Sequence, residues 1–177
     1  KYKFSSVTPE IRKLADKSLD GYKINPELYT KYDVKRGLRD LDGNGVVAGL
    51  TNISTIKVLD MGDGMPNHGD GKLYYRGIDV EDIVSGFIKE KRFGFEETIY
   101  LLLFGDMPSE HELTEFKKIL ADFRELPTTF TRDVIMKAPS DNMMNTLAKS
   151  VLALYSYDED ANNIAIPNVM RQCIELI

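Results

Sequence analysis

Few side chains in this sequence could do chemistry, and the first of its two histidines stands in the most polar segment. His68 has Asp63, Asn67 and Asp70 around it, an oxygen-rich set of the kind that holds cations. A calcium loop, however, alternates its acidic residues before a glycine and ends in a bidentate glutamate, a spacing that is absent here. We therefore interpret residues 60–71 as an exposed, mobile connector that binds no metal.

The second histidine and the single cysteine stand in predicted helices with nothing to activate them. His111 lies between Glu110 and Glu112 in a first helical turn, where the sequence places no nucleophile or orienting group, so we predict a surface histidine. Cys173 falls on the apolar side of the last predicted helix, where burial raises the pKa of a thiol and leaves it inert. One cysteine excludes an internal disulfide and a thiolate zinc cluster, and it suits a reducing compartment.

Arg76, in the stretch LYYRGIDVED, is the charged residue whose setting best suits binding of a ligand. A guanidinium between two tyrosines and a glycine could grip a carboxylate in a bidentate fork. We favour a simpler interpretation, in which Arg76 makes an ion pair or stacks on Tyr74 or Tyr75. The nearby glycines form no phosphate-binding loop, because no Gly-Lys-Ser/Thr motif or spaced glycine triplet joins a strand to a helix. We predict no catalytic residue, no cofactor-binding residue and no metal ligand in this chain.

Composition and charge narrow the class of protein. The chain has 177 residues, enough for one compact domain or part of a larger one, and 42% of them are hydrophobic. No apolar run approaches the roughly 18 residues that cross a bilayer. With 23 Lys and Arg against 28 Asp and Glu, the net charge is −5 and the basic residues are scattered, which argues against nucleic acid as a partner. We expect a cytoplasmic globular protein.

Short helices and a small hairpin are expected in the first half of the chain. Thr8 before Pro9 indicates a helix N-terminus, and an Asn-Pro pair repeats this signal further on. Apolar residues interleaved with Thr and Ser over residues 46–59 predict a strand. Residues 73–75 are expected to pair with it as the second strand of a short hairpin.

The second half of the sequence predicts helices with clear boundaries. We expect Asp79 to cap one helix, Gly105 to end the next, and Ser109 with Glu112 to form a capping box at the head of a third. Apolar residues at helical spacing define the faces that should point inward. These residues are Ile83, Val84, Phe87 and Ile88, then Leu113, Phe116, Ile119, Leu120 and Phe123, then Met144, Leu147, Val151, Leu154 and Tyr155.

Two further helices are expected at the end of the chain. Ser140 or Asp141 would cap the first, and Pro167 would open the last. The last helix has an apolar side that includes Val169 and runs to Ile177, with no Gly, Asn or basic residue after it. Leaving such residues in water would cost roughly 1.5 to 3 kcal/mol apiece, so we expect a partner surface, and truncation is the simplest account.

Four consecutive stretches resemble the citrate synthase family in order and spacing. They are GLRDLDGNGVVAGLTNIS (37–54), GKLYYRGIDVEDIV (71–84), RFGFEETIYLLLFGDMPSEHEL (92–113) and NMMNTLAKSVLALYSYD (142–158). The resemblance implies a mainly α fold, a fragment of a multi-helical citrate-synthase-like large domain with a small β-hairpin near the N-terminus. Residues 1–36 then form a helical extension of bacterial type. Residues 37–177 form the N-terminal part of the large domain, truncated at its C-terminal end.

The resemblance also implies a chemistry, the condensation of acetyl-CoA with oxaloacetate to give citrate and free CoA. In this family an aspartate deprotonates the thioester methyl group, two histidines bind the enol oxygen and the ketone, and arginines clamp the carboxylates. Those residues belong to later segments, beyond the point that matches Ile177, so neither His68 nor His111 takes a catalytic role. The chain alone is predicted to be inactive and to bind no cofactor, with acetyl-CoA a substrate only of the full-length enzyme.

Self-association is a further implication. In the family, the helices that match residues 142–157 and 168–177 take part in the helix sandwich at a dimer two-fold, and Ala148 and Ala153 are small enough for another helix to approach. A homodimer and a hexamer both stay open. Two other functions also stay open: a 2-methylcitrate synthase that uses propionyl-CoA, and a non-catalytic helical module that binds another protein through its last helix.

Overall fold

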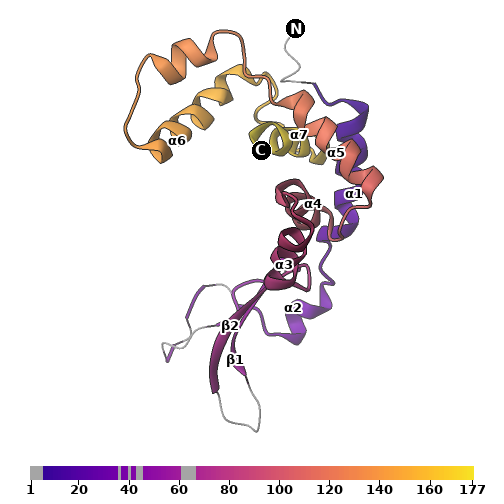
Figure 1. Cartoon of the computed structure of the whole chain (residues 1–177). Coiled ribbons are helices and arrows are strands. Elements are labelled where there is room, and N and C mark those ends of the chain that lie inside the picture. Colours follow the sequence, from indigo (N-terminus) through magenta and orange to yellow (C-terminus); the bar gives the residue numbers. More distant parts are fainter. Residues whose placement is uncertain (1–5, 36, 40, 43–45, 61–66) are drawn as a thin grey trace. The chain divides into compact units, whose positions relative to one another are not determined.

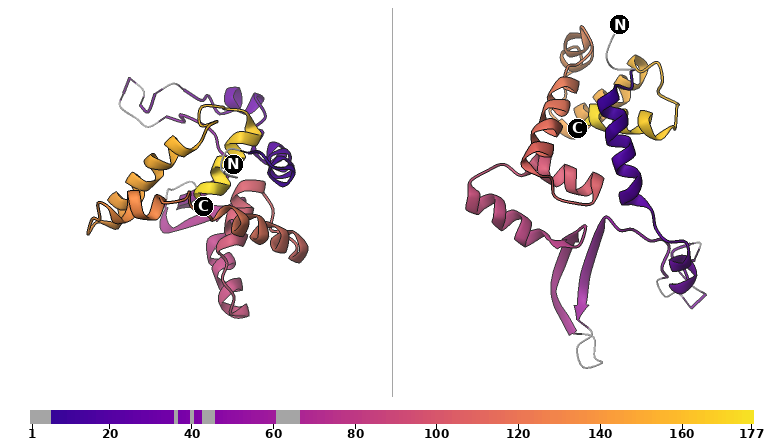
Figure 2. Two further views of the ribbon diagram at one scale, coloured as in Figure 1. Left: turned by 90° about the horizontal axis from the view of Figure 1, so that it is seen from above. Right: turned by 90° about the vertical axis from the view of Figure 1, so that its right-hand side faces the viewer.

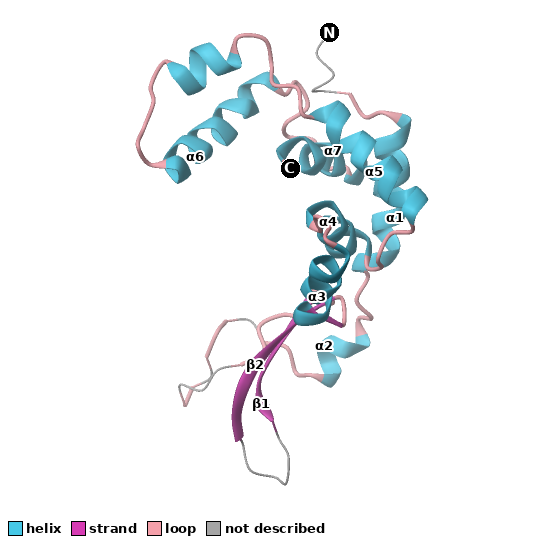
Figure 3. Cartoon of the chain, in the orientation of Figure 1, coloured by secondary structure: helices cyan, strands magenta, loops and turns pink. Residues whose placement is uncertain are grey.

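The computed structural model describes residues 6–35, 37–39, 41–42, 46–60 and 67–177. Within them the chain is mainly α-helical with a small antiparallel sheet, as predicted (Figures 1 and 3). In chain order, the elements are α1 (Pro9–Tyr22), α2 (Glu27–Lys31), β1 (Ser54–Asp60), β2 (Asn67–Tyr75), β3 (Ile78–Asp79), α3 (Val80–Glu90), α4 (Phe95–Phe104), α5 (Glu110–Phe123), a π-helical segment η3 (Thr131–Met136), α6 (Met143–Leu154), a short 3₁₀ turn η4 (Tyr155–Tyr157) and α7 (Ile166–Leu176).

The chain packs into two compact units. One comprises residues 18–113 and contains α2, the sheet, α3 and α4. The other comprises residues 1–17 and 114–177 and contains most of α1 and α5, together with η3, α6, η4 and α7. The domain boundary expected between residues 36 and 37 comes from the resemblance to a family, whereas the two units are defined by contacts within the chain. The expected boundary therefore stays a prediction.

The sheet has the strand order β1-β2-β3, with both pairs antiparallel. Figure 2 shows β1 and β2 as a two-stranded ribbon, in which Ser54 faces Tyr75 and Asp60 faces Asn67. The hairpin is therefore confirmed, but its limits differ from the sequence prediction. Pairing starts at residue 54 rather than 46, and β2 takes in residues 67–71, which were expected in the loop. The ladder is made by backbone groups, so a glycine-rich stretch of low strand propensity can join it.

Each unit has its own apolar core. In the unit of residues 18–113, the buried apolar residues are Ile83, Tyr100, Leu101 and Phe104, from α3 and α4. In the other unit they are Ile11, Leu14, Ala15, Phe116, Leu120, Phe130, Met170 and Ile174. The apolar stripe predicted for α5 is confirmed at Phe116 and Leu120. On α3 only Ile83 is buried, and Ile88 is 70% exposed, so the predicted inner face is too wide.

Most predicted helix boundaries are confirmed by the residues that cap the helices. Asp79 accepts a hydrogen bond from the Glu81 amide at 2.9 Å, and Gly105 ends α4 with φ at +98°. Ser109 and Glu112 form the capping box, with the Glu112 carboxylate accepting from the Ser109 amide at 3.0 Å. These caps are set within a few residues of chain, which is why the sequence alone predicts them.

The cap of α6 was predicted one or two residues early. Asn142 is the cap, because its Oδ1 accepts from the Asn145 amide at 3.0 Å. Ser140 instead accepts from the Asn142 amide at 3.2 Å and so stabilises the preceding turn. No helix of the described residues has both the length and the apolar character that crossing a membrane requires.

Candidate functional site

The three residues with the most reactive side chains are placed on three different elements. His68 lies on β2, opposite Leu59 rather than in a loop, and its side chain is outside the described part. His111 is exposed in the first turn of α5, as predicted. Cys173 is half-buried on α7, where burial raises the pKa of its thiol and so lowers its reactivity. Among the described residues, no group of three His, Cys, Asp or Glu side chains is placed to hold a metal.

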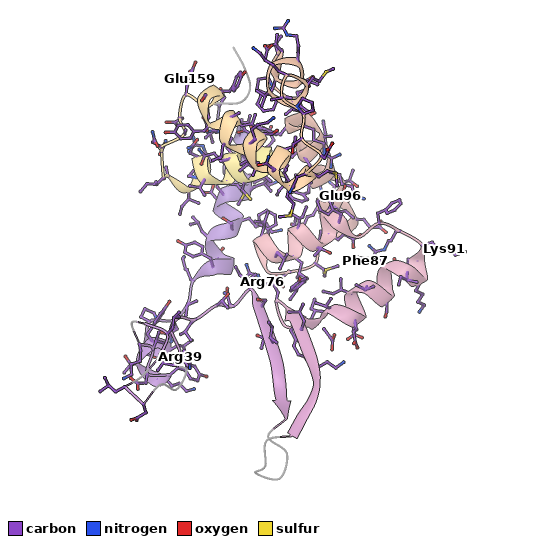
Figure 4. The ribbon with its side chains drawn as sticks, turned by 90° about the vertical axis from the view of Figure 1, so that its left-hand side faces the viewer. Arg39, Arg76, Phe87, Lys91, Glu96 and Glu159 are labelled. Carbon is purple, nitrogen blue, oxygen red and sulfur yellow. The ribbon has the colours of Figure 1, made fainter. Side chains whose placement is uncertain are left out.

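Arg76 lies in a two-residue turn that joins β2 to β3. Tyr75 pairs with Ile78 across this turn, and Arg76 and Gly77 have φ angles of 49° and 88°. Positive φ at both central residues is the requirement of a type I′ hairpin turn, and it is uncommon and strained for an arginine. The turn therefore fixes the guanidinium at the end of the sheet, beside α4 (Figure 4).

The Arg76 guanidinium binds the C-terminal ends of two helices. Its Nη1 donates to the Gly21 carbonyl in the last turn of α1 at 2.8 Å, and its Nη2 donates to the Leu102 carbonyl in the last turn of α4 at 2.7 Å. Nη1 also donates to Asn52 Oδ1 at 2.9 Å. Carbonyls at a helix C-terminus lack intrahelical donors and carry partial negative charge, so a cation there is stabilising. The expected ion pair or tyrosine stacking is wrong, since Arg76 makes neither within the described chain.

Gly21 is part of the same junction for a steric reason. A Cβ atom added to Gly21 would lie 3.0 Å from the Phe104 carbonyl oxygen, closer than side chains normally approach backbone. The Gly21 carbonyl also accepts from Asn52 Nδ2 at 2.7 Å. Arg76, Asn52 and Gly21 thus join α1, α4 and the sheet through hydrogen bonds to backbone, and the role of Arg76 is structural.

A second arginine, Arg171 on α7, is fully buried and held by acidic and amide groups. Its Nη2 donates to both carboxylate oxygens of Asp158 at 2.8 Å, and its Nη1 donates to Glu175 Oε2 at 2.8 Å. Its Nε donates to Asn168 Oδ1 at 3.0 Å. The side chains of Asp158 and Glu175 are only 7% and 3% exposed. One positive charge therefore faces two buried carboxylates.

The pKa values of the two carboxylates in this cluster are shifted in opposite directions. Burial alone would raise the pKa of Asp158, but hydrogen bonds from Gln172 and Arg171 outweigh it and hold this pKa below its ordinary value. Burial raises the pKa of Glu175 to about 7, because the opposing effect of Arg171 is smaller and the Asp158 charge adds to the rise. Glu175 Oε1 is buried and accepts no hydrogen bond from any described residue.

Next to the cluster is a cavity of about 470 Å³, formed by α6, η4, the following turn and α7. Most of its lining is apolar, from Val151, Leu152, Leu154 and Leu176. Its polar lining includes Gln172 and Glu175. Among the described residues that line the cavity there is no histidine, cysteine or lysine, so the printed lining offers none of these groups as a nucleophile or a base.

Sequence reasoning missed the Arg171 cluster, although the sequence carried a signal for it. Arg171 and Glu175 stand at i and i+4 on a predicted helix, and Asn168 stands at i−3, which places all three on one face. Asp158 comes from a turn outside that helix, so its approach to Arg171 depends on packing that helical spacing does not reveal.

Comparison with known proteins decides the family. The family model "Citrate synthase, C-terminal domain" matches residues 40–177, which is most of the chain. The chain belongs to the citrate synthase family. Members of this family are transferases, and the family match begins close to Gly37, where the resemblance in the sequence begins.

Citrate synthases and 2-methylcitrate synthases are both among the curated relatives of the chain. A citrate synthase of Haloferax volcanii is 31% identical over 131 residues, which cover 73% of this chain and 29% of the relative. A citrate synthase of Saccharolobus solfataricus is 32% identical over 91 residues, 51% of this chain and 22% of the relative. The 2-methylcitrate synthase 1 of Corynebacterium glutamicum is 30% identical over 127 residues, 72% of this chain and 28% of the relative. The chain thus spans less than a third of the length of these relatives.

Proposed function

We propose that this chain is part of a citrate synthase, and that it supplies scaffold rather than the reacting groups. The reaction is the condensation of the acetyl group of acetyl-CoA with oxaloacetate and water to give citrate and CoA, a step of the tricarboxylic acid cycle. The observation that carries the proposal is the family match over residues 40–177. We place the enzyme in the cytoplasm, because a chain with a single cysteine suits a reducing compartment.

The second part of the proposal, that the chain alone is inactive, is supported by what its polar side chains do. Arg76 holds helix ends, and Arg171 is enclosed by Asp158 and Glu175. Neither guanidinium is therefore available to clamp a substrate carboxylate. The histidine and aspartate chemistry of the condensation is assigned to polypeptide outside these 177 residues.

A 2-methylcitrate synthase is the alternative within the family, because three relatives with this name are 30% to 34% identical to the chain, about as similar as the citrate synthases are. It differs in accepting propionyl-CoA, whose extra methyl group needs room in the acyl pocket. Discrimination by one methylene is worth about 1 to 3 kcal/mol, so the two activities differ in degree.

Self-association through α6 and α7 is the third part of the proposal. None of the α6 residues is buried, although the helix is apolar; Met144 is 82% exposed and Leu152 is 76% exposed. Contiguous exposed apolar surface is characteristic of interaction sites. We propose that a second copy of the chain covers it, in an isologous contact around a two-fold axis.

The native gene product tests this proposal directly. Antibodies raised against the 177-residue chain would be used to isolate the polypeptide from its source cells, and CoA release would be measured with oxaloacetate and each acyl-CoA. The proposal predicts turnover with acetyl-CoA at a higher kcat/KM than with propionyl-CoA. The reverse order would assign the 2-methylcitrate alternative, and no turnover with either would favour the protein-interaction module.

A further inference from the structure

We propose, on the basis of the self-association proposed above, that Glu175 makes the contact between two copies of the chain sensitive to pH. Each copy takes up one proton at Glu175 when the contact forms. The dimer is therefore favoured at low pH and dissociates as the pH rises. This regulation is separate from the condensation chemistry, and a chain without any turnover would still possess it.

Glu175 lies between the ionic cluster and the surface that a second copy is proposed to cover. It pairs with Arg171, and it also lines the cavity of about 470 Å³ whose lining includes Val151 and Leu152 of α6. Its Oε1 is already closed to solvent, so solvent in the cavity stabilises the carboxylate charge from a distance. When a second copy covers α6, this solvent is replaced by apolar side chains. The charged form of Glu175 is then penalised without any contact between the second copy and its carboxylate.

The charge balance of the cluster shows which group takes the proton. One buried guanidinium, that of Arg171, serves two carboxylates, so the cluster carries one excess negative charge when both are ionised. Asp158 accepts further hydrogen bonds from Gln172 and from the Asp160 amide, each at 3.0 Å, which hold it in its charged form. Glu175 accepts only from Arg171 among the described residues, since its Oε1 has no donor there. Protonation of Glu175 therefore balances the cluster.

Within the described chain, no further charged group is placed to replace this proton. From the turn after η4, the group that faces Glu175 is the Asp158 carboxylate, which repels its charge. From η4, Tyr155 lines the same cavity, and its hydroxyl donates to Asn162 Oδ1 at 3.1 Å. The one charged residue of α6 is Lys149, whose ammonium group donates to the Ala138 carbonyl. An isologous contact of two α6 helices thus brings apolar side chains to the cavity and no free cation.

The pH range of the effect follows from the single chain. Burial already raises the pKa of Glu175 to about 7 before any association, and the loss of solvent in the dimer raises this pKa further. A proton that binds the dimer more tightly than the monomer also strengthens the dimer, because the coupling is reciprocal. The dissociation constant should therefore level off below about pH 7, where both states are protonated, and rise above it.

Sedimentation equilibrium of the 177-residue chain at about pH 6 and about pH 8 tests the linkage. The dissociation constant of the wild type is expected to rise at least about tenfold between the two, since a rise of one unit in the pKa of each copy is worth about tenfold per copy. In Glu175→Gln, which cannot lose a proton, the two values should agree within about twofold. Glu125→Gln, an exposed change with the same effect on net charge, should keep the rise, which separates Glu175 from general repulsion between acidic chains.

Calorimetry of the wild type measures the same protons without any variant. Dilution of the dimer at about pH 8, in two buffers of different ionisation heat, should show that dissociation releases protons. A dimer with equal dissociation constants at both pH values, a rise that persists in Glu175→Gln, or dissociation without proton release would each overturn the linkage and leave the self-association standing. A chain that is monomeric at every concentration and at both pH values would overturn the self-association as well.

Discussion

Arg76 and Arg171 show how the same side chain meets two environments in this fold. Arg76 is held by neutral carbonyls at helix ends, whereas Arg171 is held by two carboxylates in a buried cluster. The type of residue indicates that each can pair with negative groups, but not which groups it meets. The partner of each arginine lies far from it in the sequence: Gly21 is 55 residues from Arg76, and Asp158 is 13 residues from Arg171. Local sequence patterns do not reveal such contacts.

Replacing Arg76 tests the helix-end junction. Lysine carries one ammonium group in place of the planar fork, so Arg76→Lys cannot reach the Gly21 and Leu102 carbonyls together. We expect the free energy of unfolding to fall by about 1 to 3 kcal/mol, measured by urea denaturation. The exposed change Arg12→Lys is the control and should leave stability within about 0.5 kcal/mol. Equal effects of the two substitutions would contradict the junction.

Glu175 makes a prediction about pH. Its pKa is about 7 in the folded chain and 4.5 in the ordinary state, so between these values the folded chain holds a proton that the unfolded chain has released. The free energy of unfolding should therefore fall as the pH rises through this window and level off above it. In Glu175→Gln this fall should be absent.

Comparing the wild type with Glu175→Gln isolates the effect of Glu175, because the two proteins share every other titrating group. Urea denaturation would be measured at several pH values from about 4.5 to 8, within the window set by the two pKa values. Asp158 acts in the opposite sense and at lower pH: its lowered pKa stabilises the fold above 3.8, and this contribution is lost on further acidification. An identical pH dependence in wild type and Glu175→Gln would refute the buried, weakly solvated state of this carboxyl group.

At the scale of elements, the sequence predicted what is decided locally. The caps at Asp79, Gly105 and Ser109 are short-range contacts and were identified correctly. The hairpin was identified but not its length, because strand pairing extended into a glycine-rich stretch. The exposure of α6 could not be inferred, since an apolar stripe indicates that a helix packs against something without saying whether the partner belongs to the same chain.

A charge on α6 tests the proposed self-association. Met144→Lys places a cation on the exposed apolar face, where a second copy would have to desolvate it without a partner. Multi-angle light scattering should give twice the 20.1 kDa chain mass for the wild type and the single mass for the variant. Ile88→Lys, a change of the same kind at an exposed position of α3, should stay dimeric. A wild type that is monomeric at every concentration would count against the dimer.

At the scale of the whole molecule, the sequence and the comparisons agree on the family. Both concern a chain that matches only part of the length of its relatives. The motifs from Gly37 onward predicted the mainly helical fold and the family. They did not predict two compact packing units or a cavity beside a buried ionic cluster, because both depend on how distant segments meet. The chain spans less than a third of the length of the relatives compared above.

The most direct measurement is CoA release by the purified 20.1 kDa chain, with its intact mass checked and with acetyl-CoA and oxaloacetate both saturating. We predict no release above the uncatalysed rate, and no change when His68 or His111 is replaced by alanine. Steady turnover by this species, lost in either alanine variant, would contradict the account and place the reacting groups inside these 177 residues.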